Sequence, residues 1–453
     1  MKKILIATLL VLLNCGLSHS QNQDFQKPFD LANSLSSLWI EGETEKAINV
    51  SAELVELYPF LLSSTVHNTL SQMVLSVSDE RITNANAYLE GMYAMNNKPI
   101  NDIIGPIYYW SKVVKAGDPK EIGKLVKEIE KNLGDSSNMW NMAERYGLLV
   151  LNELNEKDFS DDKVKKELLQ KIMKNLEAFP DLAEVVKGKG EGRRKHEKRA
   201  WNRYLLAYSY NYLYVNYDAE EEYLKKAAVY SPDVTDSQFK HAYFYDMALL
   251  TQNTEKINFK ATYAGYLQQN ERMDEALDVL AEDAFINPSS NNLLGLKSFY
   301  SDLSRSESFG EYWLGYINSQ SSDAPAVEIE FGESTVLNTK NMEGSWTLLE
   351  FWGTWCGPCV RELPSLEKYY QEIKSLPASK LSIYTLSYNS KDLGEFMNKN
   401  NYSFPVAEVG KEEVEAFNIQ GFPTRILMTP AGKYLKLPYN ADWKLYIKNY
   451  TQM

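Results

Sequence analysis

The sequence predicts an α plus α/β protein, with an all-helical, repeat-like domain followed by a domain whose mixed sheet is flanked by helices. Apolar residues recur at helical spacing through most of 21–310, where no stretch shows sustained alternation. Further along, the apolar run 346–352 ends directly before a helical pattern that starts at two cysteines. Two apolar runs joined by a proline–glycine turn at 425–437 then predict a hairpin.

The length and composition agree with a globular chain of two or three domains. The chain has 453 residues, of which 44% are hydrophobic and 24% charged. Its formal net charge of −13 argues against nucleic acid and anionic membrane surfaces as partners. A short polar stretch predicts a linker at 311–323, so we expect domains at 21–310 and 324–453.

The first twenty residues have the pattern of a signal peptide. Lysines at positions 2 and 3 precede the apolar run Ile4–Leu13, and small residues follow at 18–20. This pattern predicts residues 1–20 to be a signal peptide cleaved after Ser20, and hence an exported, periplasmic protein. The apolar run is too short to span a bilayer. The alternative is a lipoprotein anchored at Cys15, although the preceding Asn14 is larger than that motif requires.

Two helical segments resemble the second helix of a tetratricopeptide repeat, namely Gly42–Pro59 and Glu271–Pro288. In each segment an alanine, Ala47 or Ala276, precedes the closing proline by twelve residues, where this repeat needs close helix packing. The two alanines are 229 residues apart, which is not a multiple of the 34-residue repeat. We therefore expect an irregular helical-repeat domain, and a plain helical bundle is the alternative.

Two further features of the helical region allow a binding interpretation. The basic, glycine-rich segment 187–195 would suit an acidic protein partner, although charge runs are more often solvated loops. A series of tyrosines would suit a binding groove, but aromatic residues at mixed helical spacing more often pack between helices. These tyrosines are Tyr204, Tyr208, Tyr210, Tyr212, Tyr214 and Tyr217.

Cys356 and Cys359 enclose Gly357 and Pro358 at the point where a predicted strand ends and a helix begins. The N–H groups and dipole of a helix N-terminus stabilise a thiolate, the reactive form of cysteine. This placement predicts Cys356 to be the exposed nucleophile. Cys359, one turn inside the helix, is predicted to be the shielded resolving thiol. Pro358 falls in the first turn, where its missing N–H costs nothing.

A zinc site is the alternative interpretation of a Cys-x-x-Cys pair. A structural zinc ion needs four protein ligands. The mature chain has no further cysteine and only three histidines, His67, His196 and His241. The sequence therefore predicts no metal, and it implies no other cofactor.

The segment Trp355–Cys359 matches the active-site signature of the thioredoxin superfamily residue for residue. Pro364 matches the proline that kinks the active-site helix of that family. Gly421–Thr424 matches the loop whose cis-proline faces the disulfide, and the resemblance therefore implies a cis peptide between Phe422 and Pro423. It also implies a thioredoxin fold for residues 324–453.

Within the superfamily the resemblance narrows to the extracytoplasmic reductases of the TlpA/ResA type. The interval between Cys359 and Pro423 leaves room for an extra strand–helix insert around 398–416, and Glu362 falls where that group carries an active-site glutamate. The resemblance implies a thiol–disulfide oxidoreductase that acts on protein disulfides. It also implies a membrane electron donor that re-reduces the dithiol.

Two acids are candidates for the base that deprotonates Cys359. Glu350 lies in the predicted buried strand, where thioredoxins carry a buried aspartate, and burial raises the pKa of a carboxyl toward that of a useful base. Glu362 follows Cys359 by one helical turn, and its alternative role is that of an exposed acid suited to the helix dipole. We favour Glu350 as proton relay, with Glu362 tuning the pair. The supporting active-site residues are Trp355, Gly357, Pro358, Phe422 and Pro423.

The dipeptide between the cysteines is that of thioredoxin, which is reducing, so the predicted direction is reduction of protein disulfides. Two alternatives involve the helical domain. In one, it dimerises the chain into a disulfide isomerase. In the other, it is a scaffold that binds a protein partner, and the C-terminal domain acts only on the partner presented.

Overall fold

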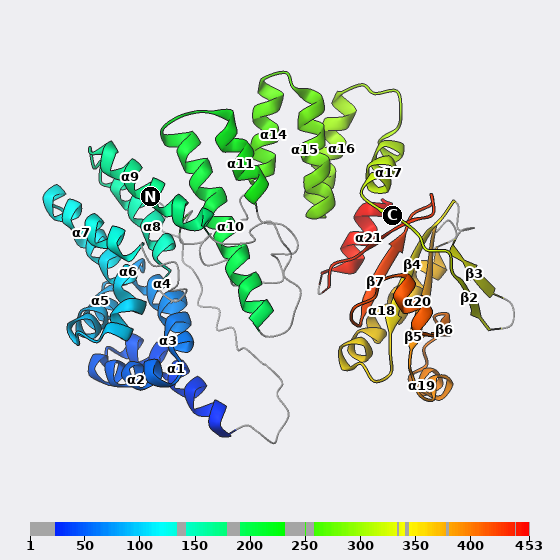
Figure 1. The fold of residues 1–453 in the computed structure, drawn as a ribbon, viewed down its shortest axis with the longest axis horizontal. Coiled ribbons are helices and arrows are strands. Elements are labelled where there is room, and N and C mark those ends of the chain that lie inside the picture. The colour runs from blue at the N-terminus through cyan, green and yellow to red at the C-terminus, as the bar shows by residue number, and fades with distance from the viewer. Residues whose placement is uncertain are drawn as a thin grey trace. The chain divides into compact units, whose positions relative to one another are not determined.

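A computed structural model describes residues 23–133, 142–178, 191–231, 250, 258–332, 335–339, 344–376, 380–439 and 441–452 (Figure 1). Side chains are described from residue 27 in the first helix and from residue 199 in α10. The predicted signal peptide, Cys15 and the side chains of the basic segment 187–195 lie outside this range. The described residues up to Phe259 form one compact unit, and those from Lys260 onward form a second.

The first unit consists of helices in the part that the structure describes. Several helices start at a side chain that accepts a hydrogen bond from an otherwise unpaired N–H group, as Ser78, Asn97, Asp118 and Asp161 do. Their apolar faces pack into one core, and none of the described helices is long and apolar enough to cross a membrane. The helices are α1 Gln23–Glu41, α2 Thr44–Leu57, α3 Pro59–Thr65, the π-helix η1 Val66–Leu70, α4 Ser71–Val74, α5 Asp79–Ala94, α6 Lys98–Lys115, α7 Pro119–Asn132, α8 Ala143–Glu156, α9 Asp162–Glu177, α10 Glu191–Asn216 and α11 Glu221–Tyr230.

The tyrosines of α10 pack mainly between helices. Tyr204, Tyr210 and Tyr212 are each at most 6% exposed. The ring of Tyr210 is stacked with those of Tyr223 and Tyr230 in α11, at centroid distances of 6.3 and 6.1 Å. These contacts favour the packing interpretation over a binding groove.

The second unit starts at Lys260, within the first of four helices that precede the sheet, namely α14 Phe259–Gln269, α15 Met273–Ile286, α16 Ser290–Asp302 and α17 Phe309–Ser319. The segment 311–323, predicted to be a linker, contains most of α17 in the structure. Trp313 of α17 is fully buried and donates from Nε1 to the Asn449 carbonyl at 3.0 Å. Tyr450 donates from its hydroxyl to the Phe285 carbonyl at 2.7 Å. This segment is therefore a packed helix, because the C-terminal helix covers its apolar face.

The C-terminal part has the predicted mixed sheet flanked by helices. Six strands are paired in the order β1-β8-β7-β4-β5-β6, with β4 parallel to β5 and antiparallel to β7. Strands β2 and β3 form a separate hairpin. The strands are β1 Ser322–Asp323, β2 Glu328–Phe331, β3 Thr335–Asn338, β4 Trp346–Trp352, β5 Leu381–Tyr388, β6 Val406–Val409, β7 Thr424–Met428 and β8 Lys433–Lys436. The helices are α18 Gly357–Ser375, α19 Leu393–Asn400, α20 Lys411–Ala416 and α21 Trp443–Thr451.

Strand β4 is the central strand that leads into the cysteines, and all seven of its residues are buried. Side chains alternate between the two faces of a strand. Leu348 and Trp352 join the core that contains side chains of α18 and α21, whereas Leu349 and Phe351 join the core on the opposite face. Glu350, between these last two, therefore lies on the face that α18 covers.

Candidate active site

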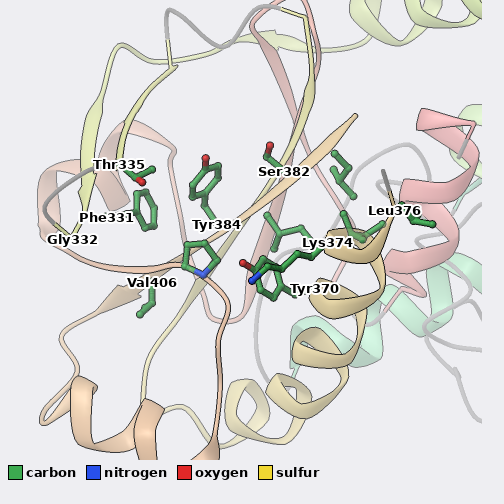
Figure 2. A pocket seen from close by; sticks show the side chains of 13 residues that line it. Phe331, Gly332, Thr335, Tyr370, Lys374, Leu376, Ser382, Tyr384 and Val406 are labelled. Atoms are coloured by element: carbon green, nitrogen blue, oxygen red, sulfur yellow. The ribbon is translucent and has the colours of Figure 1, made fainter. Parts of the chain in front are cut away.

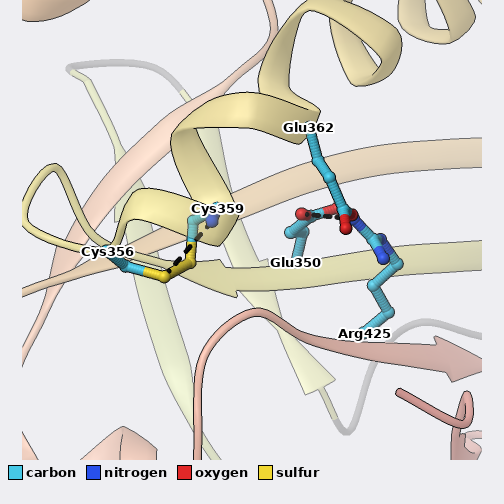
Figure 3. A network of polar contacts seen from close by, with 5 residues as sticks. All are labelled: Glu350, Cys356, Cys359, Glu362 and Arg425. Carbon is cyan, nitrogen blue, oxygen red and sulfur yellow. Dashed lines mark hydrogen bonds and ion pairs between the residues drawn. A yellow bond between two sulfur atoms is a disulfide. The ribbon is translucent and has the colours of Figure 1, made fainter. Parts of the chain in front are cut away.

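The two cysteines lie at the N-terminus of α18 and form a disulfide with an S–S distance of 2.05 Å (Figure 3). Cys356 is the N-cap residue, Gly357 and Pro358 follow as the first residues of the helix, and Cys359 lies in its first turn. The N–H of Cys359 donates to the Cys356 sulfur at 3.3 Å. In the reduced protein the same donor and the helix dipole would stabilise a thiolate at Cys356.

Both cysteines are shielded from solvent in this disulfide state. Cys359 is fully buried, as predicted, whereas Cys356 is 5% exposed and so is not the exposed residue that the sequence predicts. The bond to the buried Cys359 accounts for this difference, because it holds the Cys356 sulfur against the helix. Cys356 is nevertheless the more accessible of the two.

Three aromatic side chains, Trp355, Tyr388 and Phe422, pack against one another next to the cysteines. Trp355 is 55% exposed and donates from Nε1 to the Tyr388 carbonyl at 2.9 Å. Phe422 packs edge-on against Trp355, with 5.4 Å between ring centroids, and is stacked on Tyr388 at 5.6 Å. The Phe422–Pro423 peptide is cis, which confirms the prediction for this bond. The contact with Trp355 brings the cis-proline loop to the cysteine end of the domain.

Three charged side chains from three elements form a cluster, and one of them lies on α18 one helical turn after Cys359 (Figure 3). They are Glu350 of β4, Glu362 of α18 and Arg425 of β7. Arg425 donates from Nε to Glu350 Oε2 at 2.8 Å and from Nη2 to Glu350 Oε1 at 2.9 Å. The same Nη2 also donates to Glu362 Oε2. One guanidinium therefore holds both of the acids that the sequence singled out.

Burial controls the electrostatics of this cluster. The Glu350 side chain is fully buried, and burial raises its pKa above the ordinary value, while the Arg425 guanidinium limits that rise. Burial of Arg425 disfavours its charge, but the two carboxylates outweigh this and raise the pKa of the guanidinium. In this disulfide state neither carboxylate hydrogen-bonds to a cysteine sulfur among the described contacts.

Arg425 is the site residue that sequence reasoning missed. It lies two residues after Pro423 in a strand that was predicted correctly, and the antiparallel register of β7 on β4 places it opposite Glu350. Cross-strand neighbours of opposite charge interact favourably. A basic residue in a buried strand was a signal in the sequence, but its partner depends on the register.

No group of residues suited to binding a metal ion is found among the described residues.

A separate pocket of about 600 Å³ lies near the other end of α18 (Figure 2). Its lining includes Tyr370 and Lys374 from the last turns of α18, with Phe331, Tyr384 and Val406 from three strands. Cys359 is eleven residues before Tyr370 on the same helix, which corresponds to about 16 Å at 1.5 Å per residue. This pocket is therefore not part of the redox site.

A Cys-x-x-Cys disulfide at the start of a helix, with a cis-proline loop beside it and a mixed sheet beneath, defines a thioredoxin-like thiol–disulfide oxidoreductase domain. Residues 321–432 match the AhpC/TSA family. The helical region before them lies outside this match.

Relatives with the same domain include the thiol-disulfide oxidoreductase ResA of Bacillus subtilis. It is 26% identical over 136 residues, which cover 30% of this chain and 75% of the relative. ResA of Halalkalibacterium halodurans is 35% identical over 109 residues, which cover 23% of this chain and 59% of that relative. The crystal structure of StoA from Bacillus subtilis is 26% identical, with a TM-score of 0.23, and the match covers 27% of this chain and 96% of that one. The two sequence matches show that part of this chain is similar to ResA-type oxidoreductases.

Proposed function

We propose that this protein is an exported oxidoreductase that reduces disulfides in other proteins through the Cys356/Cys359 dithiol. The observation that carries the proposal is the disulfide at the N-terminus of α18, with Cys356 as the capping residue. The similarity to ResA supports this chemistry. The signal-peptide pattern of residues 1–20 supports export to the periplasm, with a lipid anchor at Cys15 as the alternative.

The proposed reaction starts from the reduced dithiol. The Cys356 thiolate attacks one sulfur of the substrate disulfide, which forms a mixed disulfide and releases one substrate thiolate, protonated by solvent. Cys359 then loses its proton and attacks the Cys356 sulfur. This step breaks the mixed disulfide, releases the second substrate thiolate and leaves the Cys356–Cys359 disulfide. Two electrons pass to the substrate, and a membrane electron donor has to return two electrons for the next cycle.

We propose Glu350 as the acceptor of the Cys359 proton. Its carboxyl lies on the face of the sheet that α18 covers, and burial raises its pKa toward the operating pH of a general base. Because neither Glu350 nor Glu362 hydrogen-bonds to a cysteine sulfur among the described contacts of the disulfide state, a water molecule or a small movement of Cys359 on reduction has to complete the path. Glu362 tunes the pair in this mechanism.

The helical region provides the alternative functions. Its described helices up to Phe259 have a core of their own and lie outside residues 321–432, which match the AhpC/TSA family, and this favours a binding or scaffold role for a protein partner. In that case the oxidoreductase domain acts only on the partner presented. The second alternative is a disulfide isomerase dimerised by the helices. Light scattering of the purified protein separates the two, since a monomer contradicts the isomerase.

The direction of the reaction is tested by the reduction potential, measured against glutathione. A reductase requires a value nearer to about −270 mV, as in thioredoxin, than to about −120 mV, as in the oxidant DsbA. A value at the oxidising end contradicts the proposal.

The substrate is found by trapping the mixed disulfide with Cys359→Ser, and Cys356→Ser is the control that cannot form this mixed disulfide.

A further inference from the structure

Arg425 joins two carboxylates that differ in their access to solvent. Its Nη2 donates to both Glu350 and Glu362, and its Nε donates to the second oxygen of Glu350. The Glu350 side chain is fully buried, whereas the Glu362 side chain is 38% exposed. The cluster therefore runs from a carboxylate without access to water to one that reaches it, across a single nitrogen atom.

The surroundings keep the guanidinium in place. The Arg425 side chain is 10% exposed, and its Cζ lies 4.9 Å from the ring centre of Trp443 in α21. Lys444 lies over the same Trp443 ring, at 5.3 Å, and over Tyr369 of α18, at 5.4 Å. Among the described contacts of Arg425 and Trp443, the charged and titratable groups are Glu350 on β4, Glu362 and Tyr369 on α18, and Lys444 on α21. If Arg425 left this position, the buried Glu350 would lose its partner, which is costly.

Resting on the function proposed above, we propose that Arg425 is a positioning residue of the reaction. It holds Glu350 and Glu362 as a two-carboxylate relay that carries the proton of Cys359 from the buried site to solvent. A buried base that has accepted a proton must pass it on before the next turnover. Glu350 is fully buried, and Glu362 is the partly exposed acid held against the same nitrogen. Arg425 itself remains protonated throughout, because a guanidinium does not release its proton in proteins.

The step balances without any further reactant. The S–H bond of Cys359 breaks and an O–H bond forms on Glu350, while the new thiolate attacks Cys356. The proton then moves from Glu350 to Glu362 and from there to water. Arg425 contributes by favouring the ionised form of Glu350, since an opposite charge at hydrogen-bond distance lowers the pKa of a carboxyl. Without this contribution, Glu350 would remain protonated to a higher pH and would be unable to accept the proton.

The test compares Arg425→Met with Arg361→Met in the full chain. Arg361 is exposed and adjacent to Glu362 in sequence, so its replacement removes the same charge near the site without touching the Glu350 pair. Stopped-flow measurements with a model disulfide give the rates of formation and of release of the mixed disulfide from pH 5 to 9. For Arg425→Met we expect release to slow by about 10²-fold. We also expect the midpoint of its pH profile to rise by about one to three pH units, with formation unchanged.

The arginine-to-lysine variant and a double variant separate positioning from folding. Arg425→Lys keeps the charge but not the two-pronged guanidinium that reaches both acids. Its rate of release of the mixed disulfide should therefore lie between those of the wild type and of Arg425→Met. In a Glu350→Gln background, Arg425→Met leaves no buried unpaired carboxylate, and we expect it to cause little further loss of release rate. This double variant remains informative if Arg425→Met alone fails to fold.

Three results overturn the inference, namely an additive loss in the double variant, an equal loss in formation and release, and equal effects of Arg425→Met and Arg361→Met. A wild-type potential at the oxidising end would instead contradict the proposed reductase function. The dependence of release on Arg425 would remain measurable in that case, so the two failures are distinguishable.

Discussion

At the scale of single residues, Cys356 and Cys359 differ because one caps α18 and the other lies inside its first turn. The capping position faces the helix N–H groups, which stabilise a thiolate, whereas Cys359 is fully buried. We expect iodoacetamide to label Cys356 first when the reduced protein is treated at mildly acidic pH. Peptide mass spectrometry of the alkylated protein measures this order. Equal labelling, or preference for Cys359, contradicts the assignment of nucleophile and resolving thiol.

Glu350 and Glu362 are distinguished by which half of the reaction depends on them. Attack by Cys359 requires removal of its proton, whereas attack by the Cys356 thiolate does not. Glu350→Gln should therefore slow release of the mixed disulfide by about 10²-fold and leave its formation unchanged. Glu362→Gln should have the smaller effect, because water can replace a partly exposed acid. If Glu362→Gln is the more damaging change in the stopped-flow assay, Glu362 is the relay and Glu350 is not.

The pH dependence of release follows from the burial of Glu350. Burial raises the pKa of this carboxyl, and only its ionised form accepts a proton. The release rate of the wild type should therefore rise with pH as Glu350 ionises. In Glu350→Gln this limb of the profile should disappear, while the slower rate that remains follows the ionisation of Cys359 itself. A profile that keeps the limb in Glu350→Gln would assign it to another group.

At the scale of elements, α21 connects the sheet to the helices that precede it in the second unit. Trp313 of α17 is fully buried and bonded to Asn449, so Trp313→Ala should destabilise this contact by about 3–5 kcal/mol. Leu294 on α16 is 63% exposed, and Leu294→Ala should change stability by less than about 0.5 kcal/mol. Hydrogen exchange of the α21 amides in the full chain measures both. Unchanged protection of α21 in Trp313→Ala would show that this packing contributes little.

At the scale of the whole molecule, the second compact unit begins at Lys260, well before the predicted linker. The apolar side chains of α15, α17 and α21 share one core with those around the cysteines. A fragment 258–453 keeps this core, whereas 324–453 exposes the face of α21 that α17 covers. We expect the shorter fragment to unfold at a temperature lower by about 10 °C or more, since each lost kcal/mol shifts the midpoint by about 2–4 °C. Equal midpoints in calorimetry would place the functional boundary at the predicted linker instead.

The sequence alone determined the local features of the redox site. The strand 346–352, the helix start at the cysteines and the hairpin after the cis-proline depend on residues close together in the chain, and their patterns predict them directly. The cis peptide at Phe422–Pro423 was implied by the resemblance of Gly421–Thr424 to the thioredoxin loop. Such features are local because capping, turn formation and strand alternation involve neighbouring residues.

The tertiary structure alone decided which distant residues became partners. Glu350 and Arg425 are 75 residues apart, and only the register of β7 on β4 makes them a pair. Trp313 and the Asn449 carbonyl are 136 residues apart, and their contact turns most of a predicted linker into a packed helix. A buried charge needs a partner of opposite charge, and an apolar helix face has to pack against other residues. The fold brings the partner of the charge and the residues that cover the helix from distant segments of the chain. No local sequence pattern shows that these segments are neighbours.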